Sequence, residues 1–323
     1  MKRFAKVLGA VALMSTLFGC GSAEDATAKI GVIQYAEHPA LDQAYEGFLE
    51  GLKENGYTYD ENVIVDYKLA QQDQSNCKTI TNTFVNDGVD LIYAIATPAA
   101  QAAANETKDI PVVISAVTDA KNAGLVKDNK KPGTNVTGVS DLTPVQSQLE
   151  LLTQLLPDAK KVAIMYCNAE DNSIFQANIA KEEGKKLGLE MSEATVTDSN
   201  QIQQVVESLI GKVDAIYIPT DNLLAEGMTS VAQVTNVNNL PCIVGERGFV
   251  ANGGLATYGL DYFELGKMAG KQAAQILDGA DPATMPIEYL STEKCSLTIN
   301  KTVAEQLHIT IPDELLEKAE LVE

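Results

Sequence analysis

The stretch from Lys29 to Gly56, KIGVIQYAEHPALDQAYEGFLEGLKENG, contains a complete strand–loop–helix unit. Residues 29–35 form an apolar run with little alternation, which is typical of a strand in a sheet that is covered on both faces. Pro39 then opens a helix whose apolar side chains recur at helical spacing, and Asn55-Gly56 ends it. Units of this kind build parallel sheets with helices on both faces.

The same alternation continues along the chain and restarts after residue 143. We predict further strands over residues 62–69, 90–96, 111–116, 161–166, 189–196, 214–218, 242–245, 255–258 and 297–300. We predict further helices over residues 75–85, from 98 onward, and over 144–156, 173–187, 200–210, 222–237 and 261–278. Two such runs in 323 residues predict an α/β fold with two doubly wound parallel-sheet lobes.

The composition excludes some classes of function. Acidic residues outnumber basic ones by 44 to 24, which gives a formal charge of -20. Nucleic acid is therefore not expected as a partner, because phosphate binding needs clustered lysine and arginine. A hydrophobic content of 45% is typical of a globular protein rather than a disordered one.

The first 19 residues predict an export signal. Lys2, Arg3 and Lys6 precede the apolar run from Val7 to Phe18, which is too short to span a bilayer comfortably. The run ends at Gly19-Cys20 and resembles the lipobox of bacterial lipoproteins, in which the cysteine receives the lipid. The alternative is an ordinary secretory signal in which Cys20 is incidental.

The lipobox reading predicts an exported protein that is held at the cell membrane by a lipid on Cys20 and faces the extracytoplasmic side. Residues 20–28 are small and polar, as expected of a lipidated tether. No later stretch approaches the apolar length of a membrane helix.

The sequence predicts no cofactor, no metal and no catalytic centre. Cys77, Cys167, Cys242 and Cys295 are widely spaced, and His38 and His308 are the only histidines. We find no G-x-S-x-G, no P-loop and no G-x-G-x-x-G after a strand. An exported two-lobed chain of this kind is expected to be a binding protein rather than an enzyme.

Ligands of open α/β sheets bind beyond the carboxyl ends of the strands. One such loop is Thr97-Pro98, where a helix begins and its backbone N–H groups favour an anion. A ligand carboxylate there would also be within reach of hydroxyls from Ser115 or Thr118. The alternative is that Thr97 merely caps its helix.

Asp221 follows an apolar strand in the sequence Pro219-Thr-Asp-Asn222. A carboxylate in a closed cleft is unfavourable unless it is paired, and the ammonium of an amino acid would pair it. The alternative is that Asp221 or Thr220 caps the next helix.

Aromatic and polar side chains at other strand ends complete the expected site. The candidates for stacking on an aromatic ligand are Tyr35, Tyr166, Phe249 and Tyr258, with hinge and lobe packing as the alternative for each. The full expected set is Tyr35, His38, Thr97, Pro98, Ser115, Val117, Thr118, Asp141, Tyr166, Asn168, Asp221, Asn222 and Glu246.

Several of these loops together carry a family resemblance. The chain resembles bacterial ABC-transporter substrate-binding lipoproteins, in particular the tryptophan/tyrosine-type family. The resemblance rests on the order and spacing of segments 30–34, 38–42, 96–101, 115–119, 135–141, 219–222 and 253–259. The sequence departs from the family pattern at Ala120, where proline is common, and in the looser Tyr166-Cys-Asn-Ala-Glu170 segment.

The resemblance implies a type I periplasmic-binding fold with a hinge that the chain crosses three times. It places residues 29–140 and about 257–290 in lobe 1, and residues 141–256 and about 291–323 in lobe 2. It also implies an amino-acid ligand, usually tryptophan, tyrosine or phenylalanine. Loops 96–98 and 115–118 would hold its carboxylate and Asp221 its amino group.

The implied partners are the permease and ATPase subunits of an ABC importer, with the binding protein itself a monomer. Two alternatives remain open at this point. One is a sensory receptor that signals ligand occupancy to a membrane kinase, and the other is a binder of a solute that is not an amino acid.

Overall fold

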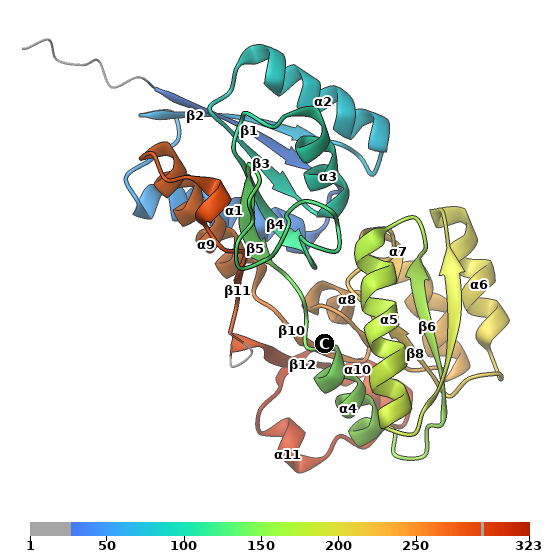
Figure 1. Cartoon of the computed structure of the whole chain (residues 1–323). Helices are drawn as coiled ribbons and strands as arrows, with labels where there is room; N and C mark the ends of the chain where they lie inside the picture. The colour runs from blue at the N-terminus through green and yellow to red at the C-terminus, as the bar shows by residue number, and fades with distance from the viewer. Residues whose placement is uncertain (1–26, 292–293) are drawn as a thin grey trace, which may run out of the picture.

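The computed structural model describes residues 27–291 and 294–323, which form two α/β lobes (Figure 1). The predicted export signal, Cys20 and nearly all of the tether lie outside the described residues. Within the described ranges, we find no helix with both the length and the apolar character that crossing a membrane requires.

Lobe 1 is built on a six-stranded sheet in the order β11-β5-β4-β3-β1-β2, and its strand pairs are parallel. Its strands are β1 (Ala28–Gln34), β2 (Val63–Leu69), β3 (Leu91–Ile95), β4 (Val112–Val117), β5 (Val136–Ser140) and β11 (Glu288–Tyr289). Its helices are α1 (Pro39–Glu54), α2 (Gln74–Asp87), α3 (Thr97–Glu106), α9 (Tyr262–Leu277) and the 3-10 turn η3 (Pro282–Thr284). Strands β3 and β4 are buried along their whole length, as their apolar runs predict.

Lobe 2 is built on a seven-stranded sheet in the order β13-β12-β10-β9-β8-β6-β7. Its strands are β6 (Lys161–Cys167), β7 (Glu190–Val196), β8 (Ala215–Ile218), β9 (Cys242–Val244), β10 (Ala256–Gly259), β12 (Ser296–Asn300) and β13 (Glu320–Val322). Its helices are α4 (Val145–Leu155), α5 (Asp171–Lys186), α6 (Ile202–Leu209), α7 (Asn222–Thr235), α8 (Arg247–Ala251), α10 (Lys301–Gln306) and α11 (Asp313–Leu316), with 3-10 turns η1 (Ser199–Gln201) and η2 (Asn236–Asn238).

The predicted fold class is confirmed, with one correction to the sheets. The chain passes between the lobes after β5, after β10 and after β11, so the hinge has three crossings (Figure 1). Strand β10 pairs with β12 in antiparallel fashion, so lobe 2 is not the purely parallel sheet that the sequence predicted. All of β10 belongs to the lobe 2 sheet, whereas the expected boundary near residue 257 divided it.

Four glycines bring α1 and α9 into direct backbone contact. A Cβ atom at Gly47 would lie 2.0 Å from the Phe263 carbonyl oxygen, and one at Gly266 would lie 2.1 Å from the Ala44 carbonyl oxygen. Gly51 and Gly270, one turn further along each helix, are equally confined. Because α1 follows His38 and α9 begins at Tyr262, this contact fixes two residues that face the interlobe cleft.

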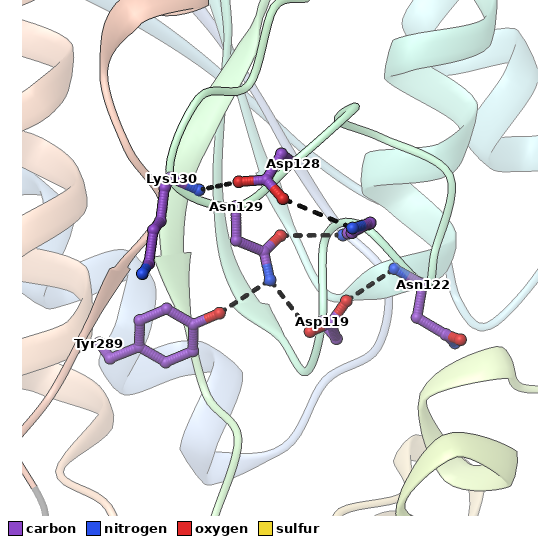
Figure 2. Close-up of polar contacts among 7 residues, drawn as sticks. Asp119, Asn122, Asp128, Asn129, Lys130 and Tyr289 are labelled. Carbon is purple, nitrogen blue, oxygen red and sulfur yellow. Dashed lines mark hydrogen bonds and ion pairs between the residues drawn. The ribbon is translucent and has the colours of Figure 1, made fainter.

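The loop after β4 is closed by a polar cluster (Figure 2). Asn129 donates from Nδ2 to Asp119 at 3.0 Å and to the Tyr289 hydroxyl at 2.9 Å, while its Oδ1 accepts from the Lys121 N–H. Asp119 also accepts the Asn122 N–H at 2.6 Å. These bonds fix the loop directly after Thr118, a residue of the cleft, and tie it to β11.

Candidate ligand-binding site

A small cavity lies between the lobes at the carboxyl ends of the strands. Six of the residues expected from the sequence line it, namely His38, Thr118, Asp141, Asp221, Asn222 and Glu246. Its volume is about 20 Å³, whereas one water needs about 10–15 Å³ on this measure. An amino acid therefore enters only when the lobes separate or the lining side chains move.

Asp221 caps helix α7, as the alternative reading of the sequence allowed. Its Oδ1 accepts the Leu224 N–H at 2.8 Å, and its Oδ2 accepts the Cys167 N–H at 2.6 Å. Glu170 lies beside it and accepts from both the backbone and the side chain of Asn222, the latter at 2.6 Å. Burial raises the pKa of Asp221 and of Glu170, and the charge of Asp221 adds to the rise at Glu170.

Two further carboxyl groups, those of Asp141 and Glu246, line the cavity. Asp141 accepts hydrogen bonds from the Tyr262 hydroxyl at 2.9 Å and from the Thr118 hydroxyl at 3.3 Å. Glu246 caps α8 by accepting the N–H groups of Gly248 and Phe249 at 2.7 and 3.0 Å. Burial raises the pKa of Asp141 to about 6 and that of Glu246 to about 7, with Asp141 adding to the second rise.

The cavity lining is therefore acidic. Three carboxylates line it, and no lysine or arginine is found among the described residues that do. Carboxylates buried without a cation are unfavourable, so the site is suited to a positively charged group of a ligand.

His38 links the two lobes at the cavity. Its Nε2 lies 3.4 Å from the Asn222 Oδ1, which can only accept, so Nε2 carries the proton. The Nδ1 atom is then an acceptor, and it is buried without a partner among the described residues. Burial lowers the pKa of His38 to about 4, so the ring is neutral at physiological pH.

The start of α3 is open to an anion. Ala96 occupies the N-cap position in place of the expected Thr97, and no side chain caps the helix in the described part of the chain. Thr97 and Pro98 are buried in the first turn, and the Thr97 hydroxyl has no partner within the described residues. The first N–H groups of a helix have no partner inside it, so they favour a ligand carboxylate.

Two alanines at the ends of β3 and β4 have a strained backbone. Ala96 has a φ of 83° and Ala116 a φ of 53°, both in the left-handed region that alanine rarely adopts. The Ala96 N–H donates to the Ser115 carbonyl at 3.1 Å, which places the start of α3 next to Ala116 of the cavity wall.

Five expected residues lie elsewhere. The Ser115 hydroxyl is bonded to the Tyr93 hydroxyl at 2.5 Å inside lobe 1, and Val117 is part of the same core. The Tyr35 hydroxyl donates to the Gln72 carbonyl, and the Tyr166 hydroxyl donates to Glu193. Asn168 is exposed. None of the five lines the described cavity, because each side chain is turned into its own lobe or into solvent.

Further contacts between the lobes were not predicted. Gln176 of α5 in lobe 2 donates to the Thr118 hydroxyl of lobe 1 at 3.3 Å, and it also donates within lobe 2 to the Thr220 hydroxyl at 2.5 Å. Outside the cavity, Gln101 of α3 donates to Asp171 of α5 at 2.8 Å. The spacing of residues within one lobe gives no signal for a partner in the other.

Among the residues outside the expected set, Phe249 lines the cavity, as its position near a strand end suggested for a stacking ring. The other lining residues outside that set are Leu41, Ala116, Asn172, Thr220, Ala225 and Tyr262. Tyr262 follows Asp261, the N-cap of α9, so a helix-start signal indicated its position without showing that it lines the cavity. Among residues 27–291 and 294–323, no group of three or more His, Cys, Asp or Glu is placed to hold a metal ion. The four described cysteines are free thiols.

Comparisons with known proteins agree with this geometry. The family model for ABC transporter substrate binding proteins matches residues 29–323. A curated tyrosine-binding protein of Clostridioides difficile strain R20291 is 39% identical over 319 residues, which cover 95% of this chain and 92% of that protein.

Two solved structures are similar in sequence and differ in state. A domain from Streptococcus pneumonia in complex with L-Trp is 42% identical with a TM-score of 0.89, covering 92% of this chain and 100% of that one. The ligand-free, open structure of a substrate binding protein with adhesive properties from Clostridium difficile is 41% identical with a TM-score of 0.72, covering 92% and 99%. At nearly equal identity, the higher score indicates that the lobes here are arranged as in the L-Trp complex.

The family match over nearly all of the described chain, the two hinged lobes and the acidic interlobe cavity lead to one conclusion, that the chain belongs to the family of ABC transporter substrate-binding proteins.

Proposed function

We propose that this protein binds an aromatic amino acid between its lobes and delivers it to an ABC importer. The observation that carries the proposal is the acceptor-rich cavity. Asp141, Asp221 and Glu246 line it without a basic residue in the described lining, and the Nδ1 of His38 adds an unpartnered acceptor. An ammonium group supplies the positive charge and the donors that these atoms lack.

The other end of an amino acid fits the start of α3. Backbone N–H groups of its first turn and the unpartnered Thr97 hydroxyl offer donors to a carboxylate. Acceptors suited to a cation and donors suited to an anion lie at neighbouring strand ends. Together they favour a zwitterion over a sugar, which carries neither charge.

An apolar wall completes the cavity. Leu41, Ala225 and the buried ring of Phe249 line it beside the polar groups. Aromatic rings bind well to such surfaces, through both apolar contact and edge-to-face packing. One relative is a tyrosine-binding protein and another has L-Trp bound, which supports an aromatic amino acid for this chain as well.

Ligand entry requires hinge motion, because the closed cavity is too small for an amino acid. The bonds from His38 to Asn222 and from Gln176 to Thr118 connect lobe 1 to lobe 2 in the closed arrangement. Opening the hinge breaks them, and a ligand that contacts both lobes restores the closed form.

The place of action in this proposal is outside the cytoplasm. Residues 1–19 direct export, Cys20 carries the lipid, and the lobes act as a monomer at the membrane surface beside the permease and ATPase. Metabolic labelling with a palmitate analogue tests the anchor, with Cys20→Ala as the variant expected to lose the label and to be released from membranes.

Calorimetry on the lobes from residue 27 onward tests the ligand. L-tryptophan, L-tyrosine and L-phenylalanine are compared with L-leucine and with myo-inositol, which represents solutes other than amino acids. We expect at least one aromatic amino acid to bind in the micromolar range or tighter. Binding of myo-inositol alone, or of none of the aromatic amino acids, contradicts the proposal.

A further inference from the structure

Asp141 and Glu246 reach the same cavity from opposite lobes. The Asp141 N–H donates to the Val117 carbonyl at 3.3 Å, and its carboxylate accepts from Thr118 and Tyr262, so Asp141 moves with lobe 1. Glu246 follows β9 and caps α8, so it moves with lobe 2. Both side chains are buried, with 4% and 5% exposure.

The other acidic pair differs because its bonds lie within one lobe. Glu170 accepts from the Asn222 backbone and side chain, from the Asn172 side chain and from the Leu223 N–H. Asp221 accepts two backbone N–H groups. All of these donors belong to lobe 2, so this pair is compensated whether the cleft is open or closed.

Asp141 and Glu246 have less compensation. Asp141 accepts only from two neutral hydroxyls, and Glu246 accepts only from two N–H groups of a short helix, among the described residues. Neither is in an ion pair in the described part of the chain. The other titratable groups that face them are Tyr262, Asp221 and the neutral ring of His38, and none of these is positive. Closing the cleft therefore brings two buried like charges together, which is unfavourable.

We propose that Asp141 and Glu246 form a cation site divided between the lobes, in which the ligand's ammonium joins two carboxylates that otherwise oppose closure. The assignment rests on the proposed function, because that function supplies the ammonium. It gives the ammonium to this pair in place of Asp221, the residue to which the family resemblance assigned it. It also makes hinge closure depend on the charge of the ligand as well as on its shape.

The first test compares amino acids with analogues that lack only the ammonium. Calorimetry measures the affinity of L-tyrosine and L-tryptophan against 3-(4-hydroxyphenyl)propionate and indole-3-propionate. The variants are Asp141→Asn, Glu246→Gln and Asp221→Asn, with Glu190→Gln on the exposed face of β7 as the matched control.

We expect the wild type to prefer the amino acid over its analogue by about 100-fold or more, since charged hydrogen bonds are strong. Asp141→Asn and Glu246→Gln each reduce this preference by about tenfold or more, by weakening amino-acid binding alone. Asp221→Asn weakens both ligands in the same proportion, because it loosens α7. An unchanged preference in both first variants, or a preference lost only in Asp221→Asn, overturns the assignment.

The second test measures closure without ligand by small-angle X-ray scattering. We expect the empty wild type to be extended, to contract with L-tyrosine, and to stay extended with saturating 3-(4-hydroxyphenyl)propionate. The double variant Asp141→Asn/Glu246→Gln is expected to be compact without ligand. If the analogue closes the wild type as L-tyrosine does, the divided site does not control closure.

The wild-type measurements decide the matter even if a variant does not fold, which circular dichroism and thermal melting check. A wild type that binds none of tyrosine, tryptophan and phenylalanine contradicts the proposed function itself. A wild type that binds an aromatic amino acid with no preference over the analogue that lacks the ammonium leaves the proposed function standing and contradicts only the divided site.

Discussion

The Nε2 atom of His38 lies 3.4 Å from the Asn222 Oδ1 and thereby connects the start of α1 in lobe 1 to the start of α7 in lobe 2. The contact exists only while the lobes are together. In the closed cleft, burial lowers the pKa of His38 from 6.5 to about 4. In an open cleft, the ring meets water and its pKa returns toward the ordinary value.

Acid is therefore expected to weaken ligand binding through His38. Between pH 6.5 and about 4 the open form binds a proton that the closed form excludes, so falling pH favours the open form. We expect a loss of affinity for L-tyrosine of about tenfold or more between pH 7 and pH 5. His38→Gln, which keeps an N–H donor for Asn222, should show a shallower loss. Calorimetry across this range gives both slopes, and equal slopes contradict the prediction.

Without ligand, the protein should close as the pH falls. Burial raises the pKa of Asp141 to about 6 and that of Glu246 to about 7 in the closed form, above the values 3.8 and 4.5 expected in water. At these two carboxyl groups the closed form binds more protons than the open one below about pH 7. Their two raised pKa values outweigh the lowered pKa of His38, so falling pH favours closure of the empty protein. Scattering of the ligand-free protein from pH 8 to pH 5 should show contraction. The Asp141→Asn/Glu246→Gln variant keeps only the His38 effect and should not contract as the pH falls. Contraction of that variant would point to other groups.

The Thr97→Val variant should bind the ligand more weakly without losing stability. The Thr97 hydroxyl is buried without a partner in the described residues, so its removal should leave the free energy of unfolding unchanged or raise it by up to about 1 kcal/mol. Affinity for L-tyrosine should fall by about tenfold if the hydroxyl donates to the ligand carboxylate. Urea unfolding and calorimetry measure the two effects.

Thr137→Val is the matched control for this experiment. The Thr137 hydroxyl is buried and donates to the Met285 carbonyl at 2.8 Å, far from the cavity lining. This variant should lose about 1–2 kcal/mol of stability and keep its affinity. Equal affinities for wild type and Thr97→Val would remove Thr97 from the carboxylate site.

Gly266→Ala should destabilise lobe 1. The new methyl group would meet the Ala44 carbonyl at 2.1 Å, and backbone atoms of α1 cannot move aside without shifting the helix. We expect a loss of about 1–3 kcal/mol in the free energy of unfolding and weaker ligand binding, because α1 and α9 place His38 and Tyr262.

Gly184→Ala in α5 is the control for the glycine contact. Its Cβ would meet only the flexible Met191 side chain, and alanine favours a helix over glycine by about 1 kcal/mol. This variant should be close to neutral in urea unfolding. A similar loss of unfolding free energy in both variants would show that the α1–α9 contact does not depend on glycine.

Gln101→Ala should loosen the closed form from outside the cavity. Its 2.8 Å bond to Asp171 joins α3 to α5 across the cleft, but it is exposed and therefore weak. We expect dissociation of L-tyrosine to accelerate by about two- to tenfold, as followed by stopped-flow fluorescence. Gln146→Ala, which removes an exposed bond to Glu150 within α4, should leave the rate unchanged. Equal rates for both variants would show that the Gln101 bond does not hold the lobes.

Much of the fold could be predicted because its inner strands are continuous apolar runs. The strands at 91–95 and 112–117 were predicted within one residue at each end, as were the starts of α1 at Pro39 and α7 at Asn222. Strand β5 was missed because Gly138 interrupts it. A Cβ at Gly138 would lie 2.1 Å from the Ile114 carbonyl, so the glycine is required by close packing that no local pattern reveals.

The short strands β11 and β13 were missed for a related reason. Each pairs with a strand far away in the sequence, and two or three residues carry too little pattern to predict. The antiparallel direction of β12 likewise depends on where the chain returns to the sheet, which periodicity does not encode.

The sequence predicted the lining residues correctly only where their position at a strand end or a helix start places them at the cavity. His38, Thr118 and Asp221 follow strands or precede helices, and they do line the cavity. Tyr166 also follows a strand, yet its hydroxyl is bonded to Glu193 on the outer side of lobe 2. Which way a side chain turns depends on neighbours from other elements, and those neighbours were unknown from the sequence alone.

The glycine contact between α1 and α9 also restricts the order in which the molecule can assemble. A ribosome makes α1 early and α9 late, so the glycine face of α1 has no partner until residues 262–277 have emerged. Lobe 2 waits even longer, because β12 and β13 follow α9 in the chain and complete its sheet. Neither lobe can therefore be completed during most of synthesis, and a product that stops short of α9 leaves both of them unfinished.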